Sequence, residues 1–244
     1  MPTLLLLLPY PFSPRWSRGA STRIRIKREP IGFVYVKSNT QEVGVSKPLA
    51  SAIKGKEGTI QAIASTVETK DPYTAGHQRR VTQLACAIAR GMGLSSDRMR
   101  VIRTTGLLHD LGKISLPADI LAKPGNLTEL EFAVIRTHPQ VAYDVLKNIE
   151  SFGQIAEIVL QHHERMDGSG YSSGLHGEQI LLEARILAVS DVVEAMFSHR
   201  PYRPALGLQK AREEIAQNSG TLYDPEVVET CLSVFDQTGF EFGE

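Results

Sequence analysis

The sequence has few cysteines and no excess of charge of either sign. Its 244 residues include only Cys86 and Cys231, and Lys plus Arg balance Asp plus Glu at 27 each. The two cysteines have neither metal-ligand nor disulfide spacing, so we expect buried thiols in a reducing compartment, with a free reactive thiol as the alternative. Because the charges balance, no global field attracts a nucleic acid polymer or an anionic membrane. Any anion-binding site must therefore be local.

Long apolar runs are also absent. The run Leu4–Leu8 lacks a preceding basic region, is shorter than the apolar core of a signal peptide and stops at Pro9. No other stretch is long and apolar enough for a membrane span. We therefore expect a cytoplasmic protein. A chain of this length can form one domain with a sizeable core and a short appendage.

Residues 1–50 differ in pattern from the rest of the chain. They combine prolines and arginines with short alternating stretches, Arg23–Lys27 and Phe33–Val36, that favour strands. Three interpretations stay open for this segment: the remnant of an upstream sensor domain, a disordered arm, or sequence upstream of the true start. Residues 51–244 are expected to form the main domain.

From about residue 56 the apolar residues follow a helical period. The expected helices run from about residue 56 to Asp71, from Thr74 to Gly91, from Asp97 to His109, from Thr128 to His138, through Ile155 to His162, from Leu181 to Ser198, and onward from Asp224. A capping box at Thr128 and an N-cap followed by proline at Asp224 mark two of the starts. Strand signals stay in the first 50 residues, so the main domain is predicted to be an all-α bundle.

Side chains that can bind metals recur at helix ends and on inward helix faces. They are His77, His109, Asp110, His138, His162, His163 and Asp191. Metal centres in helical bundles take their ligands from such facing positions. Imidazole suits Fe, Mn, Zn, Co or Ni, and a carboxylate can bridge two cations. Two cations can neutralise a phosphodiester during in-line displacement, so the pattern predicts hydrolysis of a phosphate ester.

Each of these residues also has a simpler explanation. A single inward histidine such as His77 is more often a core residue bonded to a carbonyl, and His138 can be a cation at a helix C-terminus. His162 and His163 follow an apolar stripe, so two adjacent buried imidazoles need partners. Asp191 shares its helix face with three alanines, which leave room for a ligand, although a surface aspartate is the alternative. It is the agreement among all the positions that favours a metal centre.

Several short motifs follow one another in a fixed order. They are Asp71–His77, His109–Lys113, Lys123-Pro124-Gly125, Leu127-Thr128, His138, His162-His163-Glu164-Arg165, Asp167-Gly168, Gly170-Tyr171, Asp191 and Arg200-Pro201-Tyr202-Arg203. In this order they resemble the HD-GYP family of metal-dependent cyclic dinucleotide phosphodiesterases, within the HD-domain phosphohydrolases. The resemblance covers about residues 57–237 and is far more specific than a lone His-Asp pair.

The resemblance implies an HD-domain helical bundle extended by C-terminal helices, with a short irregular or β-prone segment before it. It makes the seven residues above the ligands of two transition-metal ions, Fe or Mn, with Asp110 as the bridge. Lys113 and Asp110 would be catalytic, and Lys113, Tyr171, Arg200 and Arg203 would contact the substrate. The expected substrate is cyclic di-GMP or a related cyclic dinucleotide, opened to the linear dinucleotide pGpG, with GMP as the alternative end product.

Two positions depart from the family pattern. The family's Gly-Tyr-Pro is Gly170-Tyr171-Ser172 here, and serine lacks the fixed φ of proline, so we expect a less rigid loop. Some members carry a glutamate four residues before the first histidine, where it helps to hold a third cation, but this chain has Tyr73. A phenol with an ordinary pKa near ~10 is a poor ligand, so a two-metal centre is expected.

Two other functions stay open at this point. One is a catalytically weak signalling module that acts by nucleotide sensing or protein contact, and the other is an HD hydrolase of a different nucleotide. The retained ligands argue against the first, and the paired histidines with Arg200–Arg203 argue against the second. A signalling protein partner and a homodimer are compatible with the sequence.

Overall fold

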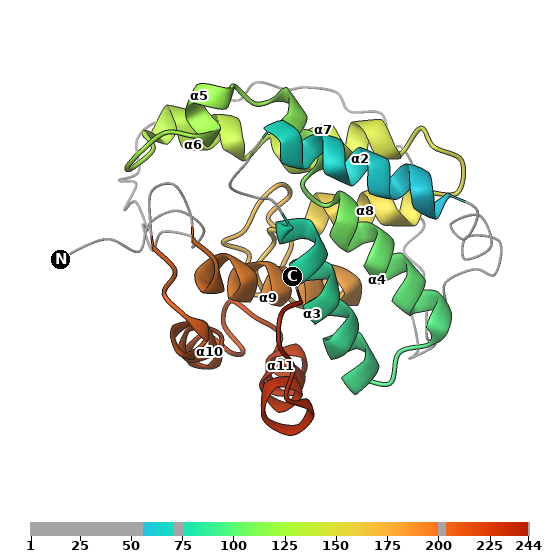
Figure 1. Cartoon of the computed structure of the whole chain (residues 1–244), viewed down its shortest axis with the longest axis vertical. Coiled ribbons are helices and arrows are strands. Elements are labelled where there is room, and N and C mark those ends of the chain that lie inside the picture. Colours follow the sequence, from blue (N-terminus) through green and yellow to red (C-terminus); the bar gives the residue numbers. More distant parts are fainter. Residues whose placement is uncertain (1–55, 71–75, 200–203, 244) are drawn as a thin grey trace, which may run out of the picture. The chain divides into compact units, whose positions relative to one another are not determined.

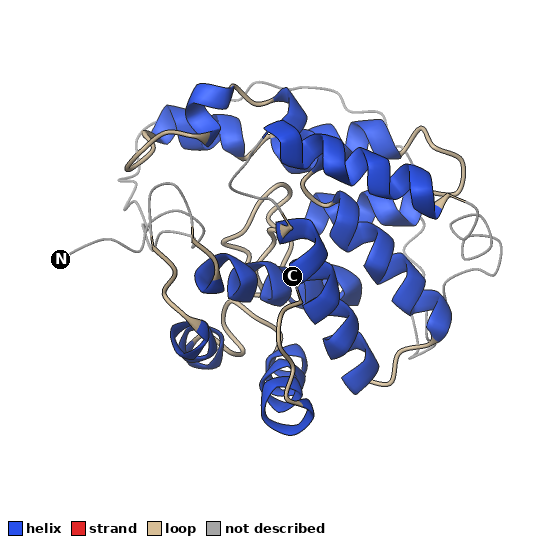
Figure 2. Cartoon of the chain, in the orientation of Figure 1, coloured by secondary structure: helices blue, strands red, loops and turns tan. Residues whose placement is uncertain are grey.

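The structure is a computed structural model that describes residues 56–70, 76–199 and 204–243. All of these lie in one compact unit of the chain, and a second unit, residues 10–44, falls outside the described part. The strand-prone stretches predicted for residues 1–50 are outside it too. The described residues form helices and no strand (Figure 2), so the predicted all-α class is confirmed.

The helices vary in length from a single turn to the 16 residues of α9. In chain order they are α2 (Glu57–Lys70), α3 (His77–Gly91), α4 (Ser96–Leu108), the 3₁₀ turn η2 (Leu111–Ser115), α5 (Ala118–Leu121), α6 (Glu129–Ile135), α7 (His138–Leu146), α8 (Gly153–Gln161), the 3₁₀ turn η3 (Gly177–Gln179), α9 (Leu182–Phe197), α10 (Leu208–Gln217) and α11 (Pro225–Thr238). In the described residues, no helix combines the length and apolar character needed to cross a bilayer.

Helix α3 lies at the centre of the bundle. It packs along α4 on one side and against α9 and α11 on others (Figure 1). Its apolar residues Val81, Leu84 and Ile88 are fully buried, as their i, i+3, i+7 spacing predicts. Removing each such side chain from water contributes about 1.5–3 kcal/mol. These buried side chains hold α3 in the bundle. His77 is the first residue of α3, so its position is held with the helix.

A close approach of α3 and α4 depends on Gly106. A Cβ atom at that position would lie 2.5 Å from Oγ1 of Thr82 on α3. Since such a contact is far too short, any larger residue at 106 would push the two helices apart. The helix pair therefore holds the end of α4, and with it His109, close to α3.

The remaining helices complete the bundle around this pair. Helix α7 packs on α8 and on η2, while α2 packs on α4 and η2. The C-terminal helices α10 and α11 pack on α9, which confirms that C-terminal helices extend the bundle, as expected. Cys86 and Cys231 are both free and buried, as predicted.

One predicted helix is wrong in extent. Thr128 does cap α6 through the expected capping box with Glu131, but α6 ends at Ile135. His138 begins the next helix, α7, with Pro139 in its first turn. Proline is tolerated there because the first-turn N–H groups have no intrahelical partner. His138 is therefore not a cation at a helix C-terminus.

Candidate metal centre

The seven predicted metal ligands converge from separate helices on one buried site. None of the seven residues is more than 6 % exposed. His77 begins α3, His109 caps the C-terminus of α4, His138 begins α7, and His162 caps the C-terminus of α8. Asp191 lies within α9, where Ala184, Ala188 and Ala195 are also buried. Helix termini thus supply most of the site.

Asp110 lies between two groups of histidines. Its Oδ2 atom is 3.6 Å from Nε2 of His77 and 3.5 Å from Nε2 of His109. Its Oδ1 atom is 3.5 Å from Nε2 of His138, which in turn lies 3.4 Å from Nε2 of His162. The two oxygens of one carboxylate therefore face two different sets of nitrogen ligands.

Two of the residue groups have the spacing needed to hold separate cations. One is His77, His109 and Asp191, and the other is His138, His162 and His163; within each group the ligand atoms lie within 4.8 Å of one another. Asp191 also faces both groups, since Oδ1 is 3.3 Å from Nε2 of His77 and Oδ2 is 4.0 Å from Nδ1 of His163.

Backbone carbonyl groups fix the orientation of three of the rings. Nδ1 of His109 donates to the carbonyl of Gly106 at 2.7 Å, and His138 and His162 make the same bond to the residue three positions earlier, at 2.8 and 2.5 Å. Each bond places the proton on Nδ1 and directs the lone pair of Nε2 into the site. Nε2 of His109 is buried with no hydrogen-bond partner among the described residues. A buried nitrogen without a partner fits a metal ligand.

His77 is oriented by a carboxylate that the sequence reasoning missed. Glu194 is fully buried and accepts a hydrogen bond from Nδ1 of His77. It also accepts from Nε of Arg80 at 2.8 Å and from Oγ of Ser198 at 2.6 Å. A carboxylate behind a histidine makes that histidine a better metal ligand. The available signal was position, because Glu194 follows Asp191 by three residues on the same face of an apolar helix.

The electrostatics keep the candidate ligands in the protonation states that metal binding requires. Burial, with a smaller contribution from Lys113, lowers the pKa of His138 to about 4, and burial together with the neighbouring His109 and His138 lowers that of His162 to about 3. Both rings are therefore neutral at pH 7, with a lone pair to donate. Burial acts to raise the pKa of Asp110, but Lys113 and the surrounding histidines outweigh it and hold the pKa well below its ordinary value. Asp110 is a carboxylate.

The sequence between residues 61 and 227 matches the HD domain family. The chain belongs to the HD domain family. The expected placement within the HD-GYP group is also confirmed, because the most similar relatives include cyclic dinucleotide phosphodiesterases.

Three curated relatives illustrate the similarity. The "Cyclic di-GMP phosphodiesterase response regulator RpfG" of Xanthomonas campestris is 36% identical over 91% of this chain and 59% of its own length. A "Cyclic di-GMP phosphodiesterase" of Thermotoga maritima is 43% identical over 68% of this chain and 46% of its own length. The "3'3'-cGAMP-specific phosphodiesterase 3" of Vibrio cholerae is 36% identical over 70% of this chain and 37% of its own length. The chain thus spans 59% or less of these relatives.

Two solved structures share the fold. Bd1817, an HDG"Y"P protein from Bdellovibrio bacteriovorus, superposes with a TM-score of 0.55 at 16% identity, covering 77% of this chain and 61% of the other. The HD domain of the phosphodiesterase PgpH from L. monocytogenes superposes with a TM-score of 0.51 at 19% identity, covering 73% of this chain and 99% of the other. At such low identity these similarities establish the fold alone.

In this HD domain, the segment after the His-Asp pair packs directly on His138. A Cβ atom at Gly112 would lie 1.9 Å from the carbonyl oxygen of His138. Only glycine fits there, and its absence of a side chain lets η2 meet the start of α7. Lys113 follows on η2, and its Nζ atom donates to Oδ2 of Asp110 at 2.7 Å. The motif that runs from His109 to Lys113 therefore combines candidate metal ligands, a close backbone contact and a cation.

The loop after the paired histidines places Tyr171 beside the candidate metal centre. The Tyr171 ring lies 4.8 Å from that of His163, tilted by 31°, and the guanidinium of Arg136 lies 5.3 Å from the Tyr171 ring centre. A Cβ at Gly170 would meet the backbone of residues 163–165 at 2.5 Å, so this glycine lets the loop fold onto the histidines.

Glu164 holds the part of the loop that contains Ser172. Its carboxylate accepts from the backbone N–H of Ser173 at 2.6 Å and of Leu175 at 3.1 Å. These bonds fix the backbone on the C-terminal side of Ser172. The lower rigidity expected from serine in place of proline stays a prediction. The remaining predicted positions, Arg200, Arg203 and Tyr73, lie outside the described residues.

Proposed function

We propose that this protein is a metal-dependent phosphodiesterase that hydrolyses cyclic di-GMP, or a related cyclic dinucleotide, to the linear dinucleotide pGpG. The observation that carries the proposal is the position of Asp110, whose two oxygens face two separate groups of buried nitrogen ligands. A bridging carboxylate between two such groups is the arrangement that two-metal hydrolysis requires.

The ligands divide into two sets around this bridge. His77, His109 and Asp191 would hold one cation, and His138, His162 and His163 would hold the other. Mixed nitrogen and oxygen donors without thiolates favour Fe or Mn over structural zinc. When bound, the two cations would supply charge neutralisation for the phosphodiester and lower the pKa of a water molecule. The orphaned Nε2 of His109 supports this assignment because it leaves a buried lone pair for a metal.

Lys113 is the proposed catalytic cation. It donates to Oδ2 of Asp110, so its ammonium lies beside the bridge and within reach of a phosphate placed there. Negative charge grows on the phosphoryl oxygens during displacement, and an ammonium next to them stabilises the transition state more than the ground state. Asp110 would contribute by holding both cations and by orienting Lys113.

Tyr171, Arg200 and Arg203 are the proposed substrate contacts. The position of the Tyr171 ring against His163 supports a role in stacking on a nucleobase next to the scissile bond. The planar guanidinium groups of the arginines suit phosphate and guanine edges. Since Tyr73 replaces the glutamate of three-metal members, we expect two metals and an accumulation of pGpG with little GMP.

A second substrate has an observation in its favour. The Vibrio cholerae relative named as specific for 3'3'-cGAMP is 36% identical to this chain, as is the RpfG protein. Initial rates with cyclic di-GMP and with 3'3'-cGAMP would decide between them. Faster hydrolysis of cyclic di-GMP supports the proposal, and hydrolysis of neither, by protein that retains its metals, would favour a signalling module without turnover.

A further inference from the structure

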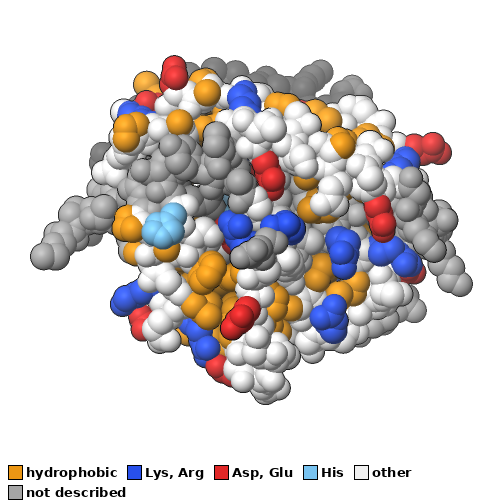
Figure 3. Space-filling view, in the orientation of Figure 1, with side chains coloured by type: hydrophobic (Ala, Val, Ile, Leu, Met, Phe, Trp, Pro, Cys, Tyr) orange, Lys and Arg blue, Asp and Glu red, His pale blue; other side chains and the backbone are white. Residues whose placement is uncertain are grey.

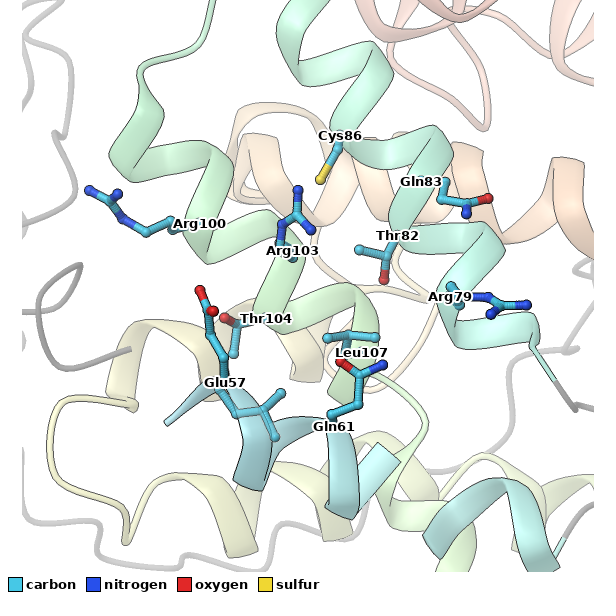
Figure 4. Close-up of a pocket in the computed structure, with 11 residues that line it drawn as sticks. Glu57, Gln61, Arg79, Thr82, Gln83, Cys86, Arg100, Arg103, Thr104 and Leu107 are labelled. Carbon is cyan, nitrogen blue, oxygen red and sulfur yellow. The ribbon is translucent and has the colours of Figure 1, made fainter. Parts of the chain in front are cut away.

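A cavity lined by both polar and apolar side chains lies between α2, α3 and α4. Its volume is about 380 Å³, and Figure 4 shows side chains from all three helices lining it. None of the lining residues belongs to the proposed metal centre. Small-molecule sites have volumes of about 300–1,000 Å³, so the cavity is large enough for a metabolite.

The residues that line the cavity carry more positive than negative charge. Arg79 from α3 and Arg100 and Arg103 from α4 line the cavity, whereas Glu57 from α2 is its one carboxylate among the described residues. Figure 3 shows that lysine and arginine side chains gather on the surface over α3 and α4. In a protein with balanced overall charge, a local excess of guanidinium groups around a cavity selects for an anion.

Several of the arginine donors are available to a ligand. Arg79 and Arg103 form no ion pair with any residue that the structure describes. Arg100 pairs with Asp97 through Nη2, but its Nε atom is buried with no hydrogen-bond partner in the described part of the chain. Guanidinium groups bind phosphate oxygens through two parallel hydrogen bonds, so phosphate is the anion that best fits these donors.

The rest of the lining suits a planar ring. Ile60 and Cys86 are buried apolar residues, and Leu107 adds a partly buried one. Figure 4 shows the amide of Gln61 rising from α2 toward Leu107. Thr104 is 3 % exposed and places its hydroxyl-bearing side chain in the cavity lining. A heterocycle can lie on the apolar side chains while the amide and the hydroxyl bond to its edge.

We propose that this cavity binds a small molecule that joins linked phosphate groups to a planar heterocycle, of the nucleoside diphosphate class. Three arginines line the cavity against one glutamate, and this excess of positive charge suits linked phosphate groups. The apolar wall then accounts for the ring. This inference does not depend on the proposed phosphodiesterase activity, because it uses none of the residues of that site.

Calorimetric titration of the full-length, metal-loaded protein with GDP tests the inference. GDP should bind the wild type, and the double variant Arg79→Ala/Arg103→Ala should bind at least about tenfold more weakly, because two charge-assisted contacts are lost. Arg90→Ala is the matched control: Arg90 is an exposed arginine on α3 that does not line the cavity. This control should bind GDP like the wild type.

A further variant separates this cavity from the metal centre. Asp110→Ala should retain GDP binding, since Asp110 is not part of the cavity. Arg103→Gln, which keeps a polar side chain at an exposed position, should weaken binding without lowering the melting temperature. The inference is overturned if millimolar GDP gives no heat of binding, if the double arginine variant binds like the wild type, or if only Asp110→Ala loses binding.

Discussion

Gly112→Ala should inactivate the protein by displacing a metal ligand rather than by removing one. The new Cβ would lie 1.9 Å from the carbonyl oxygen of His138, 2.7 Å from its carbonyl carbon and 2.9 Å from its Cα. Backbone atoms cannot yield as a flexible side chain can, so η2 and the start of α7 must separate by about 1 Å. A misplacement of about 1 Å at a reacting centre costs on the order of 100-fold in rate, and overpacking costs about 1–3 kcal/mol of stability.

The assay combines the rate of cyclic di-GMP hydrolysis, metal content and thermal melting. Gly58→Ala is the matched control, because a Cβ there meets nothing within 4 Å and the residue lies in α2. The control should keep full activity and melt at the same or a slightly higher temperature, since alanine favours helix. Wild-type activity and metal content in Gly112→Ala would refute the reasoning that this contact positions His138.

Three further predictions concern other parts of the centre. Lys113→Ala should lower kcat far more than it raises KM, as steady-state kinetics would show, because its charge acts mainly in the transition state; a change confined to KM would contradict this role. Glu194→Gln should weaken metal retention by about tenfold or more in equilibrium dialysis while melting changes little, because His77 loses its charged partner; unchanged retention would mean that Glu194 only fills space. Since Tyr73 is a poor ligand, chromatography of the reaction should show pGpG accumulating, and rapid conversion to GMP would contradict a two-metal centre.

Local sequence patterns were enough to predict most of the helices. The stripe formed by Val81, Leu84 and Ile88 predicted α3 because each apolar residue there is buried by neighbours that any helical bundle provides. The boundary at Pro139 was misjudged because proline after a helical stretch can end one helix or open the next. Helix α10 was not predicted, since only Ala211 and Ile215 of its ten residues are buried.

The seven candidate ligands that converge in the structure were predictable, whereas the groups that orient them were not. The ordered motifs named His109 and Asp110 directly. Glu194 gave no comparable signal, because its partner His77 is 117 residues away in the sequence and the contact exists only where α3 packs on α9. Gly112 belongs to a recognised motif, yet its role depends on the backbone of His138, which a sequence pattern does not show.

The central claim is that Asp110 bridges two cations on which hydrolysis depends. Metal analysis by mass spectrometry of freshly purified wild type and Asp110→Ala, on samples assayed in parallel with cyclic di-GMP, tests it directly. The wild type should carry two Fe or Mn ions per chain and hydrolyse the substrate, and Asp110→Ala should lose metal and activity together because both ligand groups share this carboxylate. An Asp110→Ala protein that keeps two metals and wild-type hydrolysis would contradict the account.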